Sequence, residues 1–435
     1  VSYKLDLTTN PIDGLTSQGK AVTLSESIDA DGVATYTASS VDGDVFVLTL
    51  RPDGSYTFEL KGPIDHDANS DSERLDFTVV ATDTDGDTDR ITLPVTIGDD
   101  SPNIASAEAL ILNENDLASG TSPDATRVSK DGDFTTLEGA DKVVSYELDL
   151  TTNPIDGLTS QGKAVMLSES IDADGVATYT ASSVDGDVFV LTLRPDGSYT
   201  FELKGPIDHD ANSDSERLDF TVVATDTDGD TDRITLPVTI GDDSPNIASA
   251  EALILNENDL ASGTSPDATR VSKDGDFTTL EGADKVVSYK LDLTTNPIDG
   301  LTSQGNAVTL SESIDADGVA TYTASSTDGD VFVLTLRPDG SYTFELKGPI
   351  DHDANSDSER LDFTVVATDT DGDTDRITLP VTIGDDSPNI ASAEALILNE
   401  NDLASGTSPD ATRVSKDGDF TTLEGADKVV SYKLD

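Results

Sequence analysis

Apolar and polar residues alternate over short stretches of the chain, with the period of two that is typical of β-strands. The clearest pair of stretches is residues 44–50 and 55–60, joined by a Pro-Asp-Gly turn at residues 52–54, and it predicts a β-hairpin. Further strand-like runs occur at residues 21–24, 33–38, 75–81, 90–97, 109–112 and 143–150. Turn-forming residues separate these runs at short intervals, without a convincing helical period. The pattern predicts an all-β sandwich.

A unit of 143 residues is repeated along the chain, so that Val1-Ser2-Tyr3 recurs at residues 144–146, 287–289 and 430–432. The copies differ in only four columns, which are Lys4/Glu147/Lys290/Lys433, Lys20/Lys163/Asn306, Thr23/Met166/Thr309 and Val41/Val184/Thr327. Catalysis gains little from indistinguishable sites in a row, whereas a spacer gains length with each copy. The repetition therefore favours a structural array. A binding module used for avidity is the alternative class.

Each unit is long enough to bury its own core, so the copies are expected to be separate domains. Residues 98–103 combine turn formers with a proline and are the best candidate for a linker. This phase predicts a repeat lacking its first strands at 1–101, complete repeats at 102–244 and 245–387, and the N-terminal part of a fourth at 388–435. The short linker predicts an elongated array, with the two terminal pieces least stable.

Acidic residues number 86 against 26 basic ones, which gives a formal charge of −60. Nucleic acid is excluded as a partner, because its phosphates would meet a surface of like charge. The acids fall in short clusters at turns, where a bound cation would relieve their repulsion; the alternative is that they only keep the protein soluble. Cysteine is absent, which excludes disulfides and thiolate sites. The apolar runs are too short to span a bilayer, and the chain, with no signal peptide before Val1, is expected to be an excised fragment.

The strongest local motif is a loop in which carboxylates alternate around a glycine. It comprises Asp83, Asp85, Asp87 and Asp89, then Asp226, Asp228, Asp230 and Asp232, then Asp369, Asp371, Asp373 and Asp375. Such a loop can turn several hard oxygens toward one Ca²⁺ ion, which takes six to eight of them. It is not an EF-hand, because glycine stands at the fourth position and Pro94 at the twelfth. A solvated acidic turn is the alternative.

A second acidic group flanks the linker. It comprises Asp99, Asp100, Glu114 and Asp116, then Asp242, Asp243, Glu257 and Asp259, then Asp385, Asp386, Glu400 and Asp402. Carboxylates on both sides of a junction predict an ion that holds one domain against the next, and an Asx-turn before Pro102 is the alternative. Weaker candidates are acidic turns at residues 29–32, 42–44, 65–73 and 130–133.

Catalysis is not expected. No carboxylate pair stands in an apolar context that would raise a pKa, and tryptophan, which could stack a sugar ring, is absent. His66 lies between two aspartates in a polar loop, which predicts an exposed charge partner instead of a general base.

Residues 48–58 (LTLRPDGSYTF), 75–87 (LDFTVVATDTDGD) and 97–102 (IGDDSP) together resemble the tandem repeats of giant repeats-in-toxin adhesins, which Gram-negative bacteria export by type I secretion. The resemblance implies immunoglobulin-like Greek key sandwiches that bind calcium within and between domains and extend an adhesive tip from the cell. It also implies calcium ligands at Asp83, Asp85, Asp87, Asp99 and Asp100 and at their equivalents in later copies. The expected location is the bacterial cell surface.

These observations lead to one hypothesis: a calcium-stiffened, non-catalytic and monomeric extender of a surface adhesin, acting in attachment or biofilm formation, whose partners are the adjacent repeats. The alternative is that the repeats themselves bind a glycan or ice, or associate with one another. Retention on glycans or ice would separate the two, because a pure spacer should show none.

Overall fold

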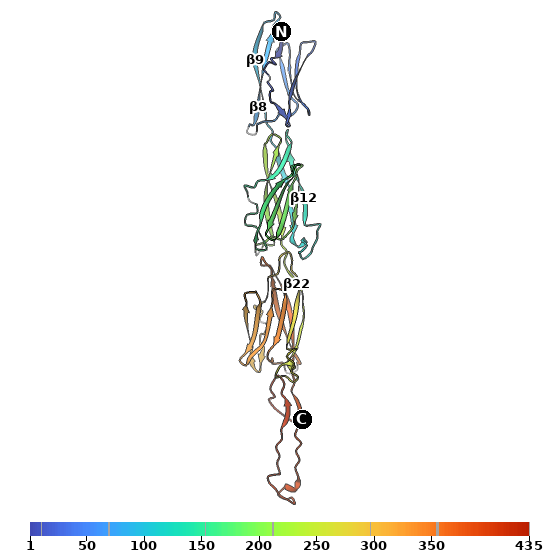
Figure 1. Ribbon diagram of the computed structural model, residues 1–435, viewed down its shortest axis with the longest axis vertical. Coiled ribbons are helices and arrows are strands. Elements are labelled where there is room, and N and C mark those ends of the chain that lie inside the picture. Colours follow the sequence, from blue (N-terminus) through green and yellow to red (C-terminus); the bar gives the residue numbers. More distant parts are fainter. Residues whose placement is uncertain are drawn as a thin grey trace. The chain divides into compact units, whose positions relative to one another are not determined.

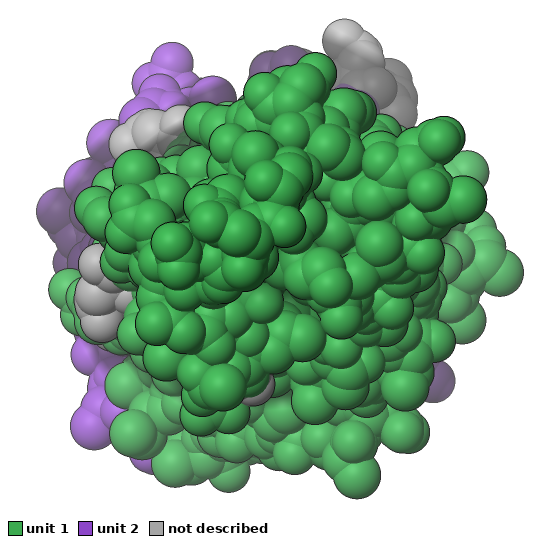
Figure 2. Space-filling model, turned by 90° about the horizontal axis from the view of Figure 1, so that it is seen from above, with its two compact units in different colours: residues 1–118, 123–242 green, residues 119–122, 243–435 purple. Residues whose placement is uncertain are grey.

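The protein is described by a computed structural model covering residues 1–9, 11–67, 70–152, 154–210, 213–295, 297–353 and 356–434. The predicted fold class, all-β with tandem immunoglobulin-like sandwiches, is confirmed: apart from three one-turn 3₁₀ helices, the described regular structure is β-strand. Within these ranges no helix has the length and apolarity needed to cross a membrane. The chain divides into two compact units, residues 1–118 with 123–242 and residues 119–122 with 243–435 (Figure 2).

Unit 1 begins with a sandwich of residues 1–98, called the first sandwich. Its sheets have the strand orders β1-β8-β9 and β4-β5-β6-β7; strands β8 and β9 are labelled in Figure 1. The bounds are β1 Ser2–Leu5, β2 Thr16–Ser17, β3 Lys20–Ala21, β4 Thr23–Ile28, β5 Ala34–Ser40, β6 Gly43–Leu50, β7 Tyr56–Leu60, β8 Ser72–Thr82 and β9 Thr88–Gly98. The predicted hairpin is present as β6 and β7, and the turn is closed by Gly54 at φ +86°.

The second sandwich of unit 1 has a six-stranded sheet, β10-β12-β19-β18-β17-β16, and a four-stranded sheet, β11-β21-β20-β13. The bounds are β10 Asn103–Ala107, β11 Leu110–Asn113, η1 Glu114–Asp116, β12 Ser129–Leu137, β13 Val143–Leu148, β14 Thr159–Ser160, β15 Lys163–Ala164, β16 Met166–Ile171, β17 Ala177–Ser183, β18 Gly186–Leu193, β19 Ser198–Leu203, β20 Ser215–Asp226 and β21 Thr231–Gly241. Strand β11 pairs with β21 in parallel, and the other strand pairs are antiparallel.

Unit 2 repeats this arrangement in the third sandwich, with the orders β22-β24-β31-β30-β29-β28 and β23-β33-β32-β25. The bounds are β22 Asn246–Ala250, β23 Leu253–Asn256, η2 Glu257–Asp259, β24 Ser272–Leu280, β25 Ser288–Leu291, β26 Thr302–Ser303, β27 Asn306–Ala307, β28 Thr309–Ile314, β29 Ala320–Ser326, β30 Gly329–Leu336, β31 Ser341–Leu346, β32 Ser358–Thr368, β33 Thr374–Gly384, β34 Asn389–Ala393, η3 Glu400–Asp402 and β35 Phe420–Leu423. The pair β34-β35 follows the third sandwich.

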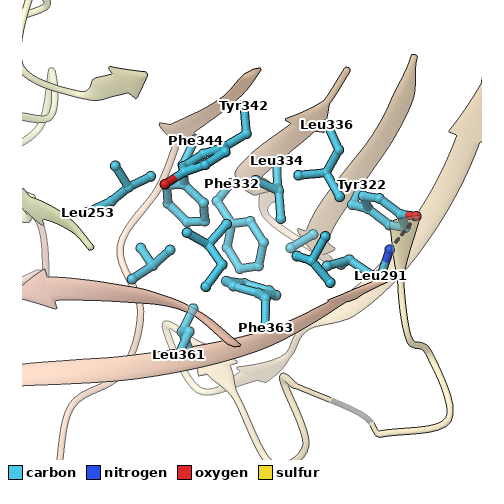
Figure 3. Close-up of a cluster of buried hydrophobic side chains, with 14 of the residues drawn as sticks. Leu253, Leu291, Tyr322, Phe332, Leu334, Leu336, Tyr342, Phe344, Leu361 and Phe363 are labelled. Atoms are coloured by element: carbon cyan, nitrogen blue, oxygen red, sulfur yellow. Dashed lines mark hydrogen bonds between the residues drawn. The ribbon is translucent and has the colours of Figure 1, made fainter. Parts of the chain in front are cut away.

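The core of each sandwich is aromatic and aliphatic, as the alternating strands predict. In the third sandwich, Phe332 stacks on Phe344 at a ring-centroid distance of 4.9 Å and meets the edge of Phe363 from the opposite sheet at 5.8 Å (Figure 3). All three rings are fully buried. Each such aromatic contact adds about 0.5–1.5 kcal/mol to the stability gained by burying apolar surface. The packed core therefore holds the strands that carry the acidic loops in fixed positions.

One predicted acidic turn is a strand instead. Residues 130–133 lie within β12, which pairs with β19. Gly132 is placed beneath Tyr199, so closely that a Cβ atom there would lie 2.6 Å from the ring. The prediction failed because Asp131 and Asp133 point to the exposed face of a strand whose buried positions are Gly132 and Phe134, and a glycine with flanking aspartates is the usual signature of a turn.

Strands β11 and β12 cover core residues that are open in the first sandwich, where the described residues include no counterpart of these strands. Tyr199 is fully buried, whereas its equivalent Tyr56 is 58% exposed. Ile91, on β9, is 71% exposed.

Candidate metal centre

The glycine-centred acidic loop of the first copy is an exposed turn between β8 and β9. The carboxylates of Asp83, Asp85 and Asp87 bring one oxygen each to within 4.8 Å of one another. Asp83 Oδ1 accepts backbone hydrogen bonds from Gly86 and Asp87 at 3.0 and 2.8 Å. A side-chain hydrogen bond with Asp85, together with these backbone bonds, lowers the pKa of Asp83 below its usual range. Asp89 is also exposed and accepts a backbone bond from Arg90.

In the later copies, the last two aspartates of the same loop accept hydrogen bonds from the start of the sandwich. Asp230 Oδ2 accepts the hydroxyl hydrogen of Ser101 at 2.6 Å, and Asp232 Oδ2 accepts the amide of Ile104 at 2.8 Å. The equivalents in unit 2 are Asp373 with Ser244 and Asp375 with Ile247. These two aspartates therefore fasten the start of each sandwich to its own loop, which leaves the first two aspartates of the motif for other contacts.

The other two aspartates of the second copy, Asp226 and Asp228, belong to a cluster at the junction of the first and second sandwiches. This junction cluster consists of Asp65, Asp99, Asp141, Asp226 and Asp228. Asp141 and Asp226 are each only 2% exposed. Among the described residues, no group hydrogen-bonds to Asp65 Oδ1, Asp141 Oδ1, Asp226 Oδ2 or Asp228 Oδ1, although all four atoms are buried.

Electrostatics shows that these carboxylates act on one another. Burial, followed by the charges of the other four cluster members, raises the pKa of Asp141 to about 7. Burial and the neighbouring carboxylate of Asp228 raise the pKa of Asp226 to about 6. Burial also raises the pKa of Asp99. The sequence-based statement that no carboxylate pair lies in a pKa-raising environment was therefore wrong, because burial at a junction is a property of the assembled domains.

His66 lies against this cluster and is 8% exposed, which corrects the expectation of an exposed charge partner. Its backbone N–H donates to Asp228 Oδ2 at 2.9 Å. Its ring atom Nδ1 lies 3.1 Å from Asp99 Oδ1 and 3.8 Å from Asp228 Oδ2. The loop 65–73, a weak candidate in the sequence, thus supplies two residues to the junction.

The linker pair Asp99 and Asp100 is split between different roles. Asp99 faces His66, whereas Asp100 Oδ2 accepts the backbone N–H of Ala140 at 3.0 Å. In unit 2, Asp243 accepts the amides of Thr121 and Ala283 at 2.7 and 2.9 Å, and Asp386 those of Thr264 and Ala426 at 2.7 and 3.0 Å. The second aspartate of each pair is therefore a clamp on the backbone.

The sequence predicted that Glu114 and Asp116 lie beside Asp99 and Asp100 at the linker. The structure places Glu114 elsewhere, with His209 and Asp242. Strand β11 and helix η1 run to the opposite end of the second sandwich, where Glu114 Oε1 accepts the amide of Ile207 at 2.7 Å. Glu114 there comes within 4.8 Å of His209 and Asp242. Asp116 is buried and its carbonyl accepts the amide of Asp124 at 2.9 Å. The parallel pairing of β11 with β21 explains the difference, because it carries Glu114 along the length of the sandwich.

Unit 2 has a related group at the C-terminal end of the third sandwich. Glu257, His352 and Asp385 bring candidate ligand atoms to within 4.8 Å of one another. Glu257 is fully buried, and burial raises its pKa to about 8. Burial and the charges of Asp351 and Asp385 raise the pKa of Asp427.

The remaining predicted residues of unit 2 have various environments. Asp259 is buried, as is Asp369, whose pKa is raised to about 8 by burial and by Asp371. Glu400 is exposed and Asp402 is half-buried.

Sequence reasoning did not single out Asp141 or its equivalent Asp427. Each follows a Glu-Gly-Ala sequence and precedes a lysine, outside the alternating acidic motifs, and no local pattern distinguishes it from other surface residues. Its position next to the loop of β20 and β21 is set by the pairing of β13 with β20.

The junction cluster fits a hard divalent cation. It offers buried carboxylate oxygens that no described residue satisfies, and Ca²⁺ prefers such oxygens. A cation would also remove the repulsion that raises these pKa values. Asp65, Asp141, Asp226 and Asp228 are the residues that would hold it.

A family model describes most of this chain. The domain of unknown function DUF5801 matches residues 109–240 and 252–383, more than half of the chain. The protein therefore belongs to the DUF5801 family, in two tandem copies. None of the curated proteins in the comparison matches it.

Several solved structures are similar in part. Mouse clustered protocadherin γC3 domains EC1–3 are 14% identical, with 78% of this chain and 85% of that chain covered and a TM-score of 0.25. Drosophila N-cadherin domains EC1–3 are 13% identical, with 86% and 96% covered and a TM-score of 0.22.

Proposed function

We propose that this chain is a non-catalytic extender segment of a large bacterial surface adhesin of the repeats-in-toxin class, exported by type I secretion. Calcium ions at the junctions hold consecutive sandwiches together, so that the copies project an adhesive tip from the cell during attachment or biofilm formation. The observation that carries the proposal is the junction cluster, in which four buried carboxylate oxygens accept no hydrogen bond from the described residues and come from two consecutive sandwiches.

The physical basis is linkage. A cation that binds the assembled junction and not the unfolded chain stabilises the junction by mass action, by about 2.7 kcal/mol at one hundred times the dissociation constant. Without it, carboxylates within a screening length of roughly 8–10 Å repel one another. The same polypeptide is thus expected to be loosely joined where calcium is scarce and firmly joined where it is plentiful. The near-identity of the copies, which adds length without new chemistry, supports a spacer.

The test is small-angle scattering and calorimetry of the chain in millimolar calcium and in excess chelator. We expect chelation to lower Tm and to increase flexibility in the scattering profile. Asp141→Asn should weaken the calcium dependence, whereas Asp174→Asn, an exposed acid in the same sandwich, should leave it unchanged. Identical profiles and Tm values with and without calcium would mean that the acids serve solvation, and the proposal would fail.

A further inference from the structure

The histidine beside the junction cluster is arranged as a metal ligand. His66 Nε2 lies 3.3 Å from the carbonyl oxygen of Ile97. A carbonyl only accepts hydrogen bonds, so the proton of the neutral ring is on Nε2 and Nδ1 presents a lone pair. Among the described residues Nδ1 makes no hydrogen bond, yet it lies 3.1 Å from Asp99 Oδ1. A lone pair so close to a carboxylate is repulsive unless a proton or a metal ion lies between them.

Unit 2 shows the same arrangement with a different hydrogen-bond partner. His352 Nε2 lies 3.2 Å from Glu257 Oε1, which leaves Nδ1 as the lone-pair nitrogen of the neutral ring. This Nδ1 is buried and makes no hydrogen bond to the described residues. Asp385, the equivalent of Asp99, lies within the same 4.8 Å group. Metal-binding histidines typically donate their other ring N–H to a backbone carbonyl or a carboxylate, which fixes the tautomer. Both partners occur here.

The distances suit a small divalent ion. Ligand bonds of about 2.0–2.2 Å to nitrogen and oxygen place neighbouring ligand atoms roughly 3–3.5 Å apart. The separations of Nδ1 from Asp99 Oδ1 and Asp228 Oδ2, 3.1 and 3.8 Å, bracket this range. Imidazole suits zinc, copper, iron and nickel, whereas calcium takes oxygen ligands.

We propose that His66 with Asp99 and Asp228, and His352 with Asp385, each bind a borderline divalent transition-metal ion such as Zn²⁺ through imidazole Nδ1 and carboxylate oxygen, while Glu257 fixes the tautomer of His352. This second class of metal site deepens the proposed function, because it rests on the same junctions but not on calcium. Asp228 can serve both ions, because its Oδ2 faces His66 whereas its Oδ1 is the buried oxygen of the junction cluster. A chain already saturated with calcium could therefore take up zinc at its histidines.

The test is calorimetric titration of the full chain with Zn²⁺ in millimolar calcium. We expect zinc binding that calcium does not displace, and X-ray absorption of the zinc-loaded wild-type chain should show imidazole in its coordination shell. The variant His66→Gln, His209→Gln, His352→Gln should lose at least about tenfold in zinc affinity. Its matched control, Asp67→Asn, Asp210→Asn, Asp353→Asn, changes an exposed acid next to each histidine and should bind zinc as the wild type does.

The outcomes separate this proposal from the calcium proposal. Displacement of zinc by calcium, an absorption spectrum without imidazole, or equal zinc affinity of the histidine and control variants would overturn the zinc site. If calcium still raises the Tm of both wild type and histidine variant, the extender proposal survives that loss. The absorption spectrum of the wild type decides the question even if the histidine variant does not fold.

Discussion

Tyr179 shows how one hydroxyl connects the two sheets of a sandwich. Its ring is fully buried, and its OH accepts the backbone N–H of Leu148 on β13 at 2.8 Å. Tyr36 and Tyr322 make the same bond to Leu5 and Leu291. Each tyrosine therefore satisfies a buried backbone donor on the edge strand of the opposite sheet.

Removing this hydroxyl should destabilise the second sandwich. Tyr179→Phe leaves the amide of Leu148 without its acceptor, which costs about 1–3 kcal/mol. Hydrogen exchange of the Leu148 amide should become faster by the corresponding factor. Tyr56→Phe, at a tyrosine that is 58% exposed, is the control and should change little. An unaltered exchange rate in Tyr179→Phe would show that the bond contributes nothing.

The raised carboxyl pKa values predict how pH acts on the calcium-free chain. Asp226, Asp141 and Glu257 have pKa values of about 6, 7 and 8, above the ordinary range near 4. The folded state thus holds these protons more tightly than the unfolded state, and stability falls as pH rises from about 5 to 8. Calorimetry in chelator should show Tm decreasing over this interval.

Millimolar calcium should reduce or reverse that trend, because the ion replaces the protons. Asp141→Asn should flatten the slope in chelator. A Tm that rises with pH in chelator would contradict the assignment.

At the residue scale, the sequence identified the acidic loops but not what each carboxylate does. Asp230 and Asp232 fasten the chain, Asp226 and Asp228 face the junction, and the alternation that marks all four is the same. Their roles depend on which neighbours the fold supplies. The positions that vary between copies are exposed or half-buried, so none of them lies in a core.

At the scale of elements, strand β11 changes the environment of an otherwise identical glycine. Gly241 on β21 lies against Asn113, and a Cβ atom at this glycine would collide with the Asn113 side chain. Gly98 is its equivalent on β9, where the nearest atom to such a Cβ is 4.0 Å away. The same substitution thus meets two different surroundings in one protein.

Gly241→Ala should therefore destabilise the second sandwich by about 0.5–1.5 kcal/mol, because the exposed Asn113 side chain must turn away from its present rotamer. Gly98→Ala should be close to neutral and is the matched control. Urea unfolding of the two variants gives the comparison. Equal midpoints would mean that β11 does not pack on β21 as described.

The sequence predicted most antiparallel strands because their alternation is local. It could not predict the parallel pairing of β11 with β21, since three apolar residues carry no information about a partner 128 residues away. Because of that pairing, Glu114, which the sequence predicted as a ligand at the linker, lies at the opposite end of its sandwich. Strand β12 was missed for a different reason. Its Asp-Gly-Asp sequence is typical of a turn, but Gly132 lies within the strand, where only glycine leaves room for the ring of Tyr199.

At the scale of the whole molecule, the charge of −60 predicts a strong effect of salt. Raising NaCl from 0.01 to 1 M shortens the screening length from about 30 to about 3 Å. In chelator this should raise Tm, because the carboxylates cease to repel one another. In millimolar calcium the effect should be smaller.

Potassium chloride at equal ionic strength is the control and should act as sodium chloride does. If salt raises Tm by the same amount with and without calcium, the repulsion between carboxylates does not arise mainly at the junction, and the prediction is wrong.

The repetition itself has a consequence for how the protein reaches this fold. Strand β11 docks on β21, but β33 has the same sequence as β21 and would accept it with the same contacts. If the neighbouring strands β10 and β12, which belong to the other sheet of the same sandwich, move together with β11, only the length of the intervening chain distinguishes the two choices, and a doubling of that length costs about 0.6 kcal/mol of loop entropy. Equilibrium alone therefore selects the right partner by a factor of only about three. Chains refolded all at once should exchange strands between copies, whereas a chain that emerges from one end can complete each sandwich before a second, identical partner is available.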